Sequence, residues 1–224
     1  MKTHKKLIAR QKECHLYLIT PPNLHLETFR VSLETILAAD KAGLIRVLQI
    51  RQKNLPSSEL QNITLSLKPI CTQHNVLLLI NDSPAIVHAT SCDGVHLGQK
   101  DPTCENARSI IGKNRIVGIT CHNSIDLAVA ASQKGADYVA FGAFFPTRTK
   151  KVEFVAKPQI LRIWKNFSKI PSVAIGGITP ENCHNLVKAG ADFLAVVSSV
   201  WEHPDGPSTA INAFKKAITE AQIN

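Results

Sequence analysis

Val76-Leu-Leu-Leu-Ile-Asn-Asp82 is a short apolar run that ends in two polar residues. Such a run indicates a strand that is buried on both faces, as in a parallel sheet. A second run, Gly94–Leu97, follows it and leads within four residues to Asp101. A carboxylate directly after a buried strand has left the apolar layer. Asp82 and Asp101 are therefore both placed to face a ligand.

Runs of this kind alternate along the chain with longer segments in which apolar residues recur at helical spacing. Alternation of strand and helix predicts βαβ units and a parallel sheet, and eight such units close into a single (β/α)8 TIM barrel. An open, doubly wound sheet is the structural alternative. Ser124, Thr179 and Ser208 are expected to open helices as caps. The predicted strands are His15–Thr20, Ile45–Ile50, Val76–Ile80, Gly94–Leu97, Ile116–Thr120, Tyr138–Phe141, Ser172–Ile175 and Phe193–Val197.

The length of 224 residues suits one barrel domain, predicted over residues 14–224. Residues 1–13 contain Lys2, Lys5, Lys6, Arg10 and Lys12 and no apolar signal-peptide core. We expect them to form a solvated basic tail.

The formal charge of +9 is compatible with nucleic acid, anionic lipid or phosphorylated substrates as partners. Aromatic residues make up only 5% of the chain, which gives no stacking platform for nucleic acid. No apolar run reaches the roughly 18 to 20 residues of a membrane span. The six cysteines form no C-x-x-C pair, which favours a reduced, cytoplasmic protein.

Three aspartates recur at a different place in the unit, just before a strand begins. Asp93, Asp137 and Asp192 each stand at a helix-to-strand turn. We assign them to the structural face of the barrel, opposite to Asp82 and Asp101.

The chemistry of such barrels lies at the carboxyl ends of the strands. After the second strand, alternation points Gln49, Arg51 and Lys53 to one side, and two cations on one face suit a diphosphate. A solvated edge is the alternative explanation of these charges.

Asp82 and Asp101 follow the third and fourth strands. Mg²⁺ takes one or two protein carboxylates and completes its shell with water and substrate phosphate oxygens, which this pair allows. Capping of the next helices is the alternative, because Pro84 and Pro102 lie close behind.

Two histidines lie near the same end of the barrel. His96 alternates with Val95 and Leu97, and a hydrogen-bonded buried histidine is favoured there over a metal ligand. His122, just beyond the fifth strand, could bind a substrate or exchange a proton near neutral pH.

The last loops suggest a second anion site. The segment from Gly142 to Lys151 contains Thr147, Thr149 and a cationic cluster, and it could clamp a phosphate or be a plain basic loop. Gly176-Gly177 ends the seventh strand and Ser198-Ser199 the eighth, where such barrels commonly bind a phosphate monoester. Two anion sites suggest the joining of two phosphorylated molecules with loss of pyrophosphate.

At these residues the chain resembles the thiamine-phosphate synthase family, from about Leu16 to the last helix. The order and spacing of the motifs are specific, although each motif alone is weak. They are Leu-Tyr-Leu-Ile-Thr20, Gln49-Ile-Arg51-Gln-Lys53, Asn81-Asp82, Gly94-Val-His-Leu-Gly-Gln-Lys-Asp101, Gly142 to Lys150, Ile175-Gly-Gly-Ile178 and Val197-Ser198.

The resemblance implies hydroxymethylpyrimidine diphosphate and hydroxyethylthiazole phosphate as substrates, Mg²⁺ as cofactor, and a homodimer at the level of the family. It gives Arg51, Lys53 and Lys150 the catalytic role, and Asp82 and Asp101 the metal. The residues implied in substrate binding, together with the histidine noted above, are Gln49, Asn81, Thr120, His122, Thr147, Thr149, Gly177, Val197 and Ser198.

The chain departs from the family's pattern at three points. Ser83-Pro84 follows Asp82, Thr120 stands where the family usually has serine, and the segment after Lys150 lacks a frequent glycine. The missing glycine bears on the expected shape of the closing loop and on the expected preference for the thiazole acceptor. A thiazole tautomerase of the same superfamily and a non-catalytic phosphometabolite or nucleic-acid binder are the alternative functions.

Overall fold

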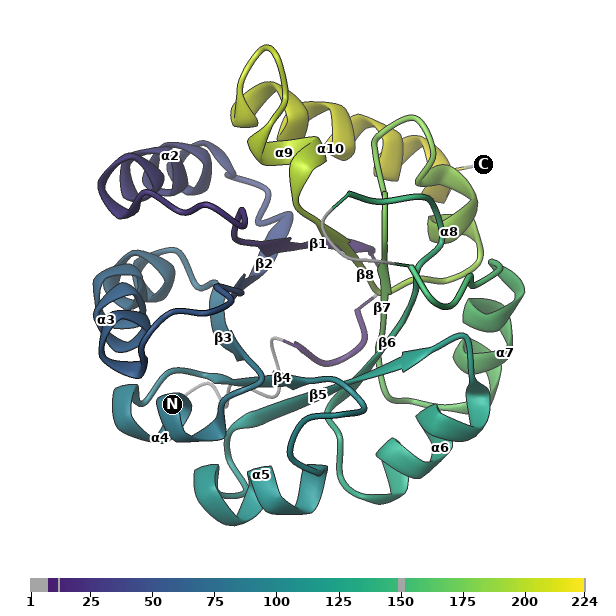
Figure 1. The fold of residues 1–224 in the computed structure, drawn as a ribbon. Helices are drawn as coiled ribbons and strands as arrows, with labels where there is room; N and C mark the ends of the chain where they lie inside the picture. The colour runs from purple at the N-terminus through teal and green to yellow at the C-terminus, as the bar shows by residue number, and fades with distance from the viewer. Residues whose placement is uncertain (1–7, 12, 149–151, 224) are drawn as a thin grey trace.

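The structure is a computed structural model that describes residues 8–11, 13–148 and 152–223. Its centre is a closed barrel of eight parallel strands in sequential order, which confirms the predicted TIM barrel (Figure 1). The strands are β1 (His15–Ile19), β2 (Ile45–Ile50), β3 (Leu77–Asn81), β4 (Gly94–Leu97), β5 (Ile116–His122), β6 (Tyr138–Gly142), β7 (Ser172–Ile175) and β8 (Phe193–Val196).

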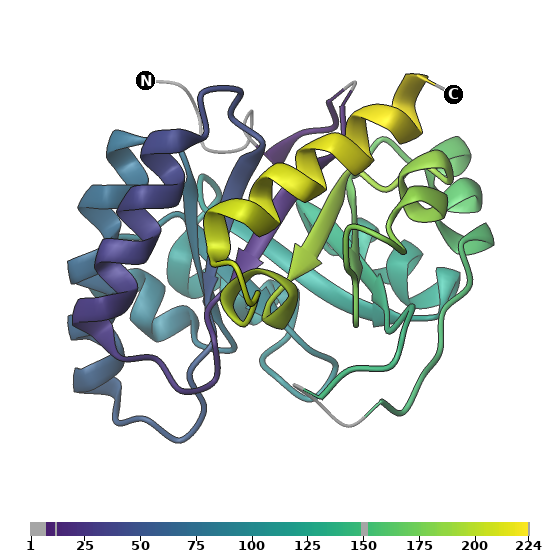
Figure 2. The ribbon, with the colours of Figure 1, turned by 90° about the horizontal axis from the view of Figure 1, so that it is seen from above.

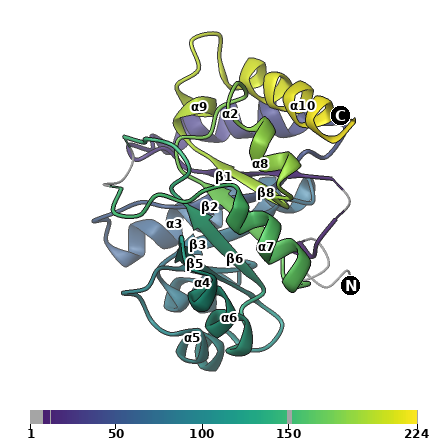
Figure 3. The ribbon, with the colours of Figure 1, turned by 90° about the vertical axis from the view of Figure 1, so that its right-hand side faces the viewer.

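The helices cover the outside of this barrel on every side (Figures 1 and 3). They are α2 (Leu26–Ala39), α3 (Ser57–Gln73), α4 (Pro84–Thr90), α5 (Cys104–Ile111), α6 (Ile125–Gln133), α7 (Gln159–Phe167), α8 (His184–Lys188), α9 (Ser198–Trp201) and α10 (Pro207–Ile223). Within the described ranges, no helix combines the length and the apolar character that a bilayer crossing requires.

One of the three expected helix caps is confirmed. The Ser124 hydroxyl accepts a hydrogen bond from the backbone N–H of Leu127 at the start of α6. Thr179 does not cap α8, because residues 180–182 form a turn before α8 begins at His184, and the Asn182 side chain accepts from the Thr179 N–H. Ser208 lies inside α10, which begins at Pro207, a residue favoured in the first turn of a helix.

Alternation along the strands divides the apolar residues into an inner and an outer set. The inner set fills the barrel axis and includes Tyr17, Leu79, Tyr138 and Phe193. The outer set packs against the helices and forms the larger core, in which Trp164 and Phe141 are in edge contact. The six cysteines are all buried, and none is paired with another.

The amino ends of the strands are closed by aspartate side chains. Asp93, Asp137 and Asp192 each accept a hydrogen bond from a backbone N–H at the start of a strand, which confirms their structural role. The donors are Leu78 (2.7 Å), Val117 (2.9 Å) and Ser172 (2.8 Å). Asp40, which the sequence did not single out, does the same for Ile45 at 2.7 Å.

The chain before β1 contributes to this closed end. Ile8 is 1% exposed and packs with the inner set of the barrel. The Arg10 guanidinium donates to Asp192 Oδ1 and to the carbonyls of Lys165, Ser168 and Ile170. The expected solvated tail over residues 1–13 is therefore not solvated at these two positions, because one side chain fills the barrel and the other satisfies carbonyls beneath it.

Candidate active site

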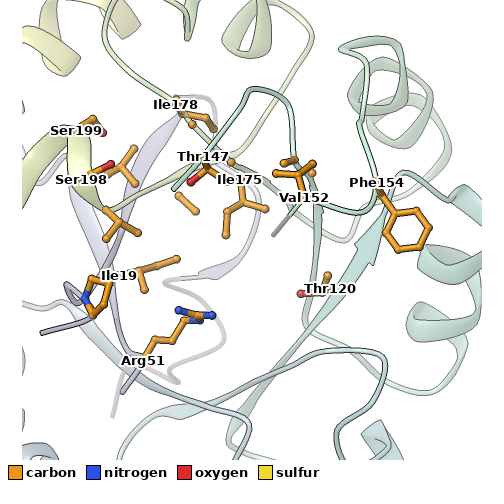
Figure 4. Close-up of a pocket in the computed structure, with 18 of the residues that line it drawn as sticks. Ile19, Arg51, Thr120, Thr147, Val152, Phe154, Ile175, Ile178, Ser198 and Ser199 are labelled. Carbon is orange, nitrogen blue, oxygen red and sulfur yellow. The ribbon is translucent and has the colours of Figure 1, made fainter. Parts of the chain in front are cut away.

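A cavity of about 150 Å³ opens at the carboxyl ends of the strands, the end where the sequence places the chemistry. Figure 4 shows Arg51, Thr120 and Ser198 at this cavity: Arg51 follows β2, Thr120 lies in β5 and Ser198 begins α9 after β8. Seven of the predicted site residues line this cavity: Arg51, Thr120, His122, Thr147, Gly177, Val197 and Ser198.

Arg51 follows β2 on a backbone that is held in place. The Thr20 hydroxyl accepts from the Arg51 N–H at 2.9 Å and from Gln52 Nε2 at 3.1 Å. Gln52 Nε2 also donates to the Pro21 carbonyl at 2.7 Å, so the ends of β1 and β2 are joined. Burial lowers the pKa of the Arg51 guanidinium, and the nearby Asp82 charge partly offsets this effect.

Asp82 and Asp101 lie close together, as predicted. Partial burial and the neighbouring Asp101 carboxyl raise the pKa of Asp82 to about 6, against the opposing charges of Arg51 and Lys53. Two carboxylates that compete for protons in this way suit a shared divalent cation. In the described part of the chain, no group of three or more histidine, cysteine or acidic side chains could hold a metal ion, so the protein ligands would be this pair.

The alternative role of these aspartates, capping of the next helices, is taken by their neighbours. Ser83 caps α4 by accepting from the Ile86 N–H, and Thr103 caps α5 by accepting from the Asn106 N–H. Asp101 Oδ2 instead accepts from the Gly98 N–H at 2.6 Å, within its own loop. Asp82 has a φ of 64°, a conformation uncommon outside glycine and one that recurs at functional sites.

Gln49 in β2 and Asn81 in β3 lie on neighbouring strands at the inner edge of the site. Gln49 Nε2 donates to Asn81 Oδ1 at 2.6 Å, and Gln49 is only 2% exposed. Lys53 is exposed beyond Arg51. These three predicted residues lie outside the cavity wall, on the side of the aspartate pair.

The end of β5 carries two predicted residues and an irregularity. The pairing of β5 with β6 shifts between Thr120 and His122, and His122 has a φ of 52°. Thr120 Oγ1 lies 2.8 Å from His96 Nε2, and Gln99 Nε2 donates to the Thr120 carbonyl at 2.5 Å. The His122 ring lies against Phe154, with 4.3 Å between ring centroids. His96 is buried and hydrogen-bonded on both ring nitrogens, as favoured from the sequence.

The loop between β6 and α7 packs onto the glycine pair after β7. The N–H of Phe145 donates to the Gly176 carbonyl at 3.0 Å. Gly177 has a φ of 61°, and a Cβ there would lie 2.2 Å from the Pro146 carbonyl oxygen. The glycines were expected to allow close approach to an anion; here they also allow close approach of two loops. Thr149 and Lys150, two further predicted residues, lie outside the described residues.

The cavity ends at the turn from β8 into α9. Ser198 is exposed there, and Ser199 beside it has a buried hydroxyl without a hydrogen-bond partner in the described structure. Trp201 Nε1 donates to the Ile19 carbonyl at 2.7 Å, which fixes this turn to the end of β1. An orphaned hydroxyl in a cavity wall that also includes Gly176 and Gly177 suits the oxygens of a phosphate group.

The sequence did not predict most of the apolar part of the wall, which includes Ile19, Val152, Phe154, Ile175 and Ile178. Ile175 ends a predicted strand and Ile19 is the last residue but one of another, so alternation could have placed them. Phe154 lies at the cavity because the N–H of Ala143 donates to its carbonyl at 3.0 Å, a long-range contact without a sequence signal.

Comparisons with known proteins agree on one family. A family model described as "Thiamine monophosphate synthase" matches residues 16–200. The thiamine-phosphate synthase of Rhodospirillum centenum is 45% identical over 92% of this chain and 98% of that protein, and that of Hyphomonas neptunium is 43% identical over 89% and 91%. The solved thiamine phosphate pyrophosphorylase of Pyrococcus furiosus has a TM-score of 0.79 at 31% identity and covers 97% of this chain and 98% of its own. The chain therefore belongs to the thiamine monophosphate synthase family and is a transferase of thiamine biosynthesis that releases pyrophosphate.

Proposed function

We propose that the chain joins hydroxymethylpyrimidine diphosphate to hydroxyethylthiazole phosphate and yields thiamine phosphate and pyrophosphate. The observation that carries this proposal is the position of Arg51. It lines the cavity that reaches Ser198 and Ser199, and its charge also acts on the pKa of Asp82. One guanidinium thus lies between a candidate phosphate pocket and a candidate metal-diphosphate site.

The aspartate pair fits a divalent metal ion. The raised pKa of Asp82 reflects, after partial burial, the Asp101 carboxyl beside it, and a cation between the two would relieve that repulsion. Oxygen ligands suit a hard divalent cation, and two carboxylates beside substrate phosphates are the arrangement usual for Mg²⁺. Charge neutralisation on the diphosphate oxygens is the chemistry that Mg²⁺ supplies when bound there.

The bond changes require no protein nucleophile. The bond from the pyrimidine CH₂ to the diphosphate oxygen breaks first, and its electron pair leaves with pyrophosphate. The electron-rich pyrimidine stabilises the resulting carbocation, and the lone pair of the thiazole nitrogen then forms the new C–N bond. We assign Arg51, Lys53 and Lys150 to the departing pyrophosphate, whose growing charge their donors stabilise.

The remaining predicted residues would position the two substrates. Gln49, Asn81 and Thr120 lie on the inner side of the site and would hold the pyrimidine. His122 would contact a substrate beside them. Thr147, Thr149, Gly177, Val197 and Ser198 would bind the thiazole phosphate, and we add Ser199 because of its orphaned hydroxyl. Such positioning brings the thiazole nitrogen into line with the breaking bond.

The decisive experiment incubates the purified protein with both substrates, with and without Mg²⁺, and measures thiamine phosphate and pyrophosphate together. We expect equal amounts of both products, and formation only with the metal. Isomerisation of a thiazole phosphate without a metal requirement would instead support the tautomerase alternative. Binding of the thiazole phosphate by folded protein without turnover in either assay would refute the proposed function.

A further inference from the structure

A chain of buried hydrogen bonds crosses the barrel axis from Asn81 to Thr120. Gln49 Nε2 donates to Asn81 Oδ1, and Gln49 Oε1 accepts from the Tyr17 hydroxyl at 2.9 Å. The hydroxyls of Tyr17 and Tyr138 are 2.8 Å apart. From Tyr138 the chain continues through His96 Nδ1, at 2.8 Å, to Thr120 Oγ1.

The donor and the acceptor of each remaining bond in this hydrogen-bond chain follow from the bond between Tyr17 and Gln49. The single phenolic proton of Tyr17 is used on Gln49 Oε1, so the proton between the two tyrosines belongs to Tyr138. Tyr138 has then donated its only proton and must accept from His96 Nδ1–H. In the neutral tautomer that has its proton on Nδ1, Nε2 of His96 carries the lone pair and accepts from the Thr120 hydroxyl at 2.8 Å.

The hydrogen-bond chain is held rigidly at Tyr17, Tyr138 and His96, the residues that determine which group donates. Tyr17 and Tyr138 are 1% and 0% exposed, and the rings of His96 and Tyr138 are stacked at an interplanar angle of 20°. The Tyr138 ring occupies the space above Gly118, where a Cβ would lie 1.9 Å from Tyr138 Cζ. The hydroxyl of Tyr138 therefore has little freedom to leave either partner.

We propose that this buried chain fixes the Thr120 hydroxyl as a hydrogen-bond acceptor toward the cavity and so selects a first substrate that presents an N–H donor. Tyr17, Tyr138 and His96 are positioning residues in this scheme, because they act through Thr120. The inference rests on the proposed function for the identity of the ligand. In hydroxymethylpyrimidine the exocyclic amino group is the N–H donor, whereas the ring nitrogens accept.

Measuring which ring nitrogen of His96 carries the proton tests the direction of the hydrogen-bond chain without any substrate. Protein labelled with ¹⁵N in its nine histidines would be examined by long-range ¹H–¹⁵N correlation, which separates protonated from unprotonated ring nitrogens. His96→Gln identifies the signals of His96 by their loss. We expect a proton on Nδ1 and none on Nε2. A proton on Nε2, alone or together with one on Nδ1, would overturn the proposed direction.

Binding of two unreactive probes tests the selectivity. The probes are hydroxymethylpyrimidine phosphate and its analogue in which an oxo group replaces the amino group. Wild-type protein should favour the amino probe by about tenfold or more, the ratio expected when a mismatched ligand leaves a polar group unpaired. Tyr138→Phe lets His96 change its tautomer and Thr120 change its role, so the ratio should fall to about threefold or less.

Thr90→Val is the matched control for loss of a buried hydroxyl. Thr90 is 3% exposed, its hydroxyl donates to the Ile86 carbonyl at 2.7 Å, and it does not belong to the hydrogen-bond chain or to the cavity wall. It should keep the wild-type ratio of the two affinities. An unchanged ratio in folded Tyr138→Phe would overturn the proposal. If neither probe binds wild-type protein while His96 shows the expected tautomer, the proposed ligand, and with it the proposed function, is refuted. The proposed direction of the hydrogen bonds is then still supported.

Discussion

Arg51 is the side chain on which both halves of the proposed site depend. It belongs to the cavity wall, and its charge acts on the aspartate pair. A planar guanidinium can contact two oxygens of a departing diphosphate at once, which a methyl group cannot replace.

Arg51→Ala should lower kcat/KM by about 10² to 10³, by analogy with the loss of an oxyanion-hole donor. Steady-state assays with both substrates at saturating Mg²⁺ would measure the change. Arg30→Ala is the matched control, because Arg30 lies exposed on α2 beside Glu27 and should keep full activity. A loss of less than about threefold at Arg51 would remove this residue from the mechanism.

The ionised carboxylate of Asp82 should lower the stability of the folded protein at neutral pH. Its pKa of about 6 in the folded protein is above the unfolded value of about 3.9, so folding favours the protonated form. Its contribution to stability is present below pH 4 and is lost as the pH rises through 6. In the presence of a chelator, Asp82→Asn should therefore raise Tm at pH 7 by about 2 °C and leave Tm at pH 4 unchanged.

Thermal melts of wild type and variant at the two pH values measure this effect. Asp205→Asn, at an exposed loop position, controls for the loss of one negative charge. A lower Tm for Asp82→Asn at pH 7 would show that Arg51 and Lys53 stabilise the carboxylate more than burial and Asp101 oppose it. The same variant should have lost most of its Mg²⁺-dependent turnover.

The strands of the barrel are the part of the fold that the sequence predicts best. Short apolar runs bounded by polar residues predicted each strand, because a parallel strand buried on both faces admits few other residues. The boundaries moved slightly, as at β5, which runs on to His122 with shifted pairing. Asp82, Asp101 and Arg51 could be placed from the ends of those strands.

The rest of the site depends on contacts between distant parts of the chain. Tyr17 and Tyr138 meet across the barrel axis, and neither has a local pattern that distinguishes it from other core residues. Phe154 reaches the cavity through backbone bonds to Ala143, and the hydroxyl of Ser199 is buried by its surroundings. Burial and partners of this kind are properties of the closed barrel and have no signature in a single strand or loop.

The two loops that pack at Gly177 should be sensitive to a single methyl group. Gly177→Ala would place a Cβ against the Pro146 carbonyl and force the β6–α7 loop outward. We expect KM for the thiazole phosphate to rise about tenfold or more, because misplacement by about 1 Å at a positioning loop has effects of that order. Steady-state kinetics with the thiazole phosphate as the varied substrate would measure it.

Gly112→Ala separates this contact from backbone strain. Gly112 also has a positive φ, of 79°, but a Cβ there meets nothing within 4 Å. It should lose about 1 kcal/mol of stability and keep the wild-type KM. Equal KM values for the two variants would mean that the loop contact does not shape the acceptor site.

The molecule as a whole separates stability from chemistry along the barrel axis. The amino ends of the strands carry the aspartate bonds, Ile8 and Arg10, whereas the cavity lies at the carboxyl ends. In Figure 2 the C-terminal end of α10 lies at the opposite end of the barrel from the β6–α7 loop.

Ile8→Ala should test this separation. Removing a side chain that is 1% exposed and packed in the inner set should cost about 2 kcal/mol of unfolding free energy or more. We expect kcat/KM to stay within about twofold of wild type, because the cavity lies at the other end of the barrel. Chemical denaturation and steady-state assays measure the two quantities, and Val31→Ala at an exposed position of α2 is the control. A loss of activity at unchanged stability would contradict the separation.

The direction in which α10 ends has a practical consequence for handling the protein. An anchor attached beyond Ile223, whether a bead, a sensor chip or a fused partner enzyme, would hold the barrel by its closed base. The open end would then face the surrounding solution, and both substrates could reach it without passing the anchor. Immobilised protein should therefore turn over at nearly the rate of free protein, whereas coupling through the loop that bears Phe154 should block entry.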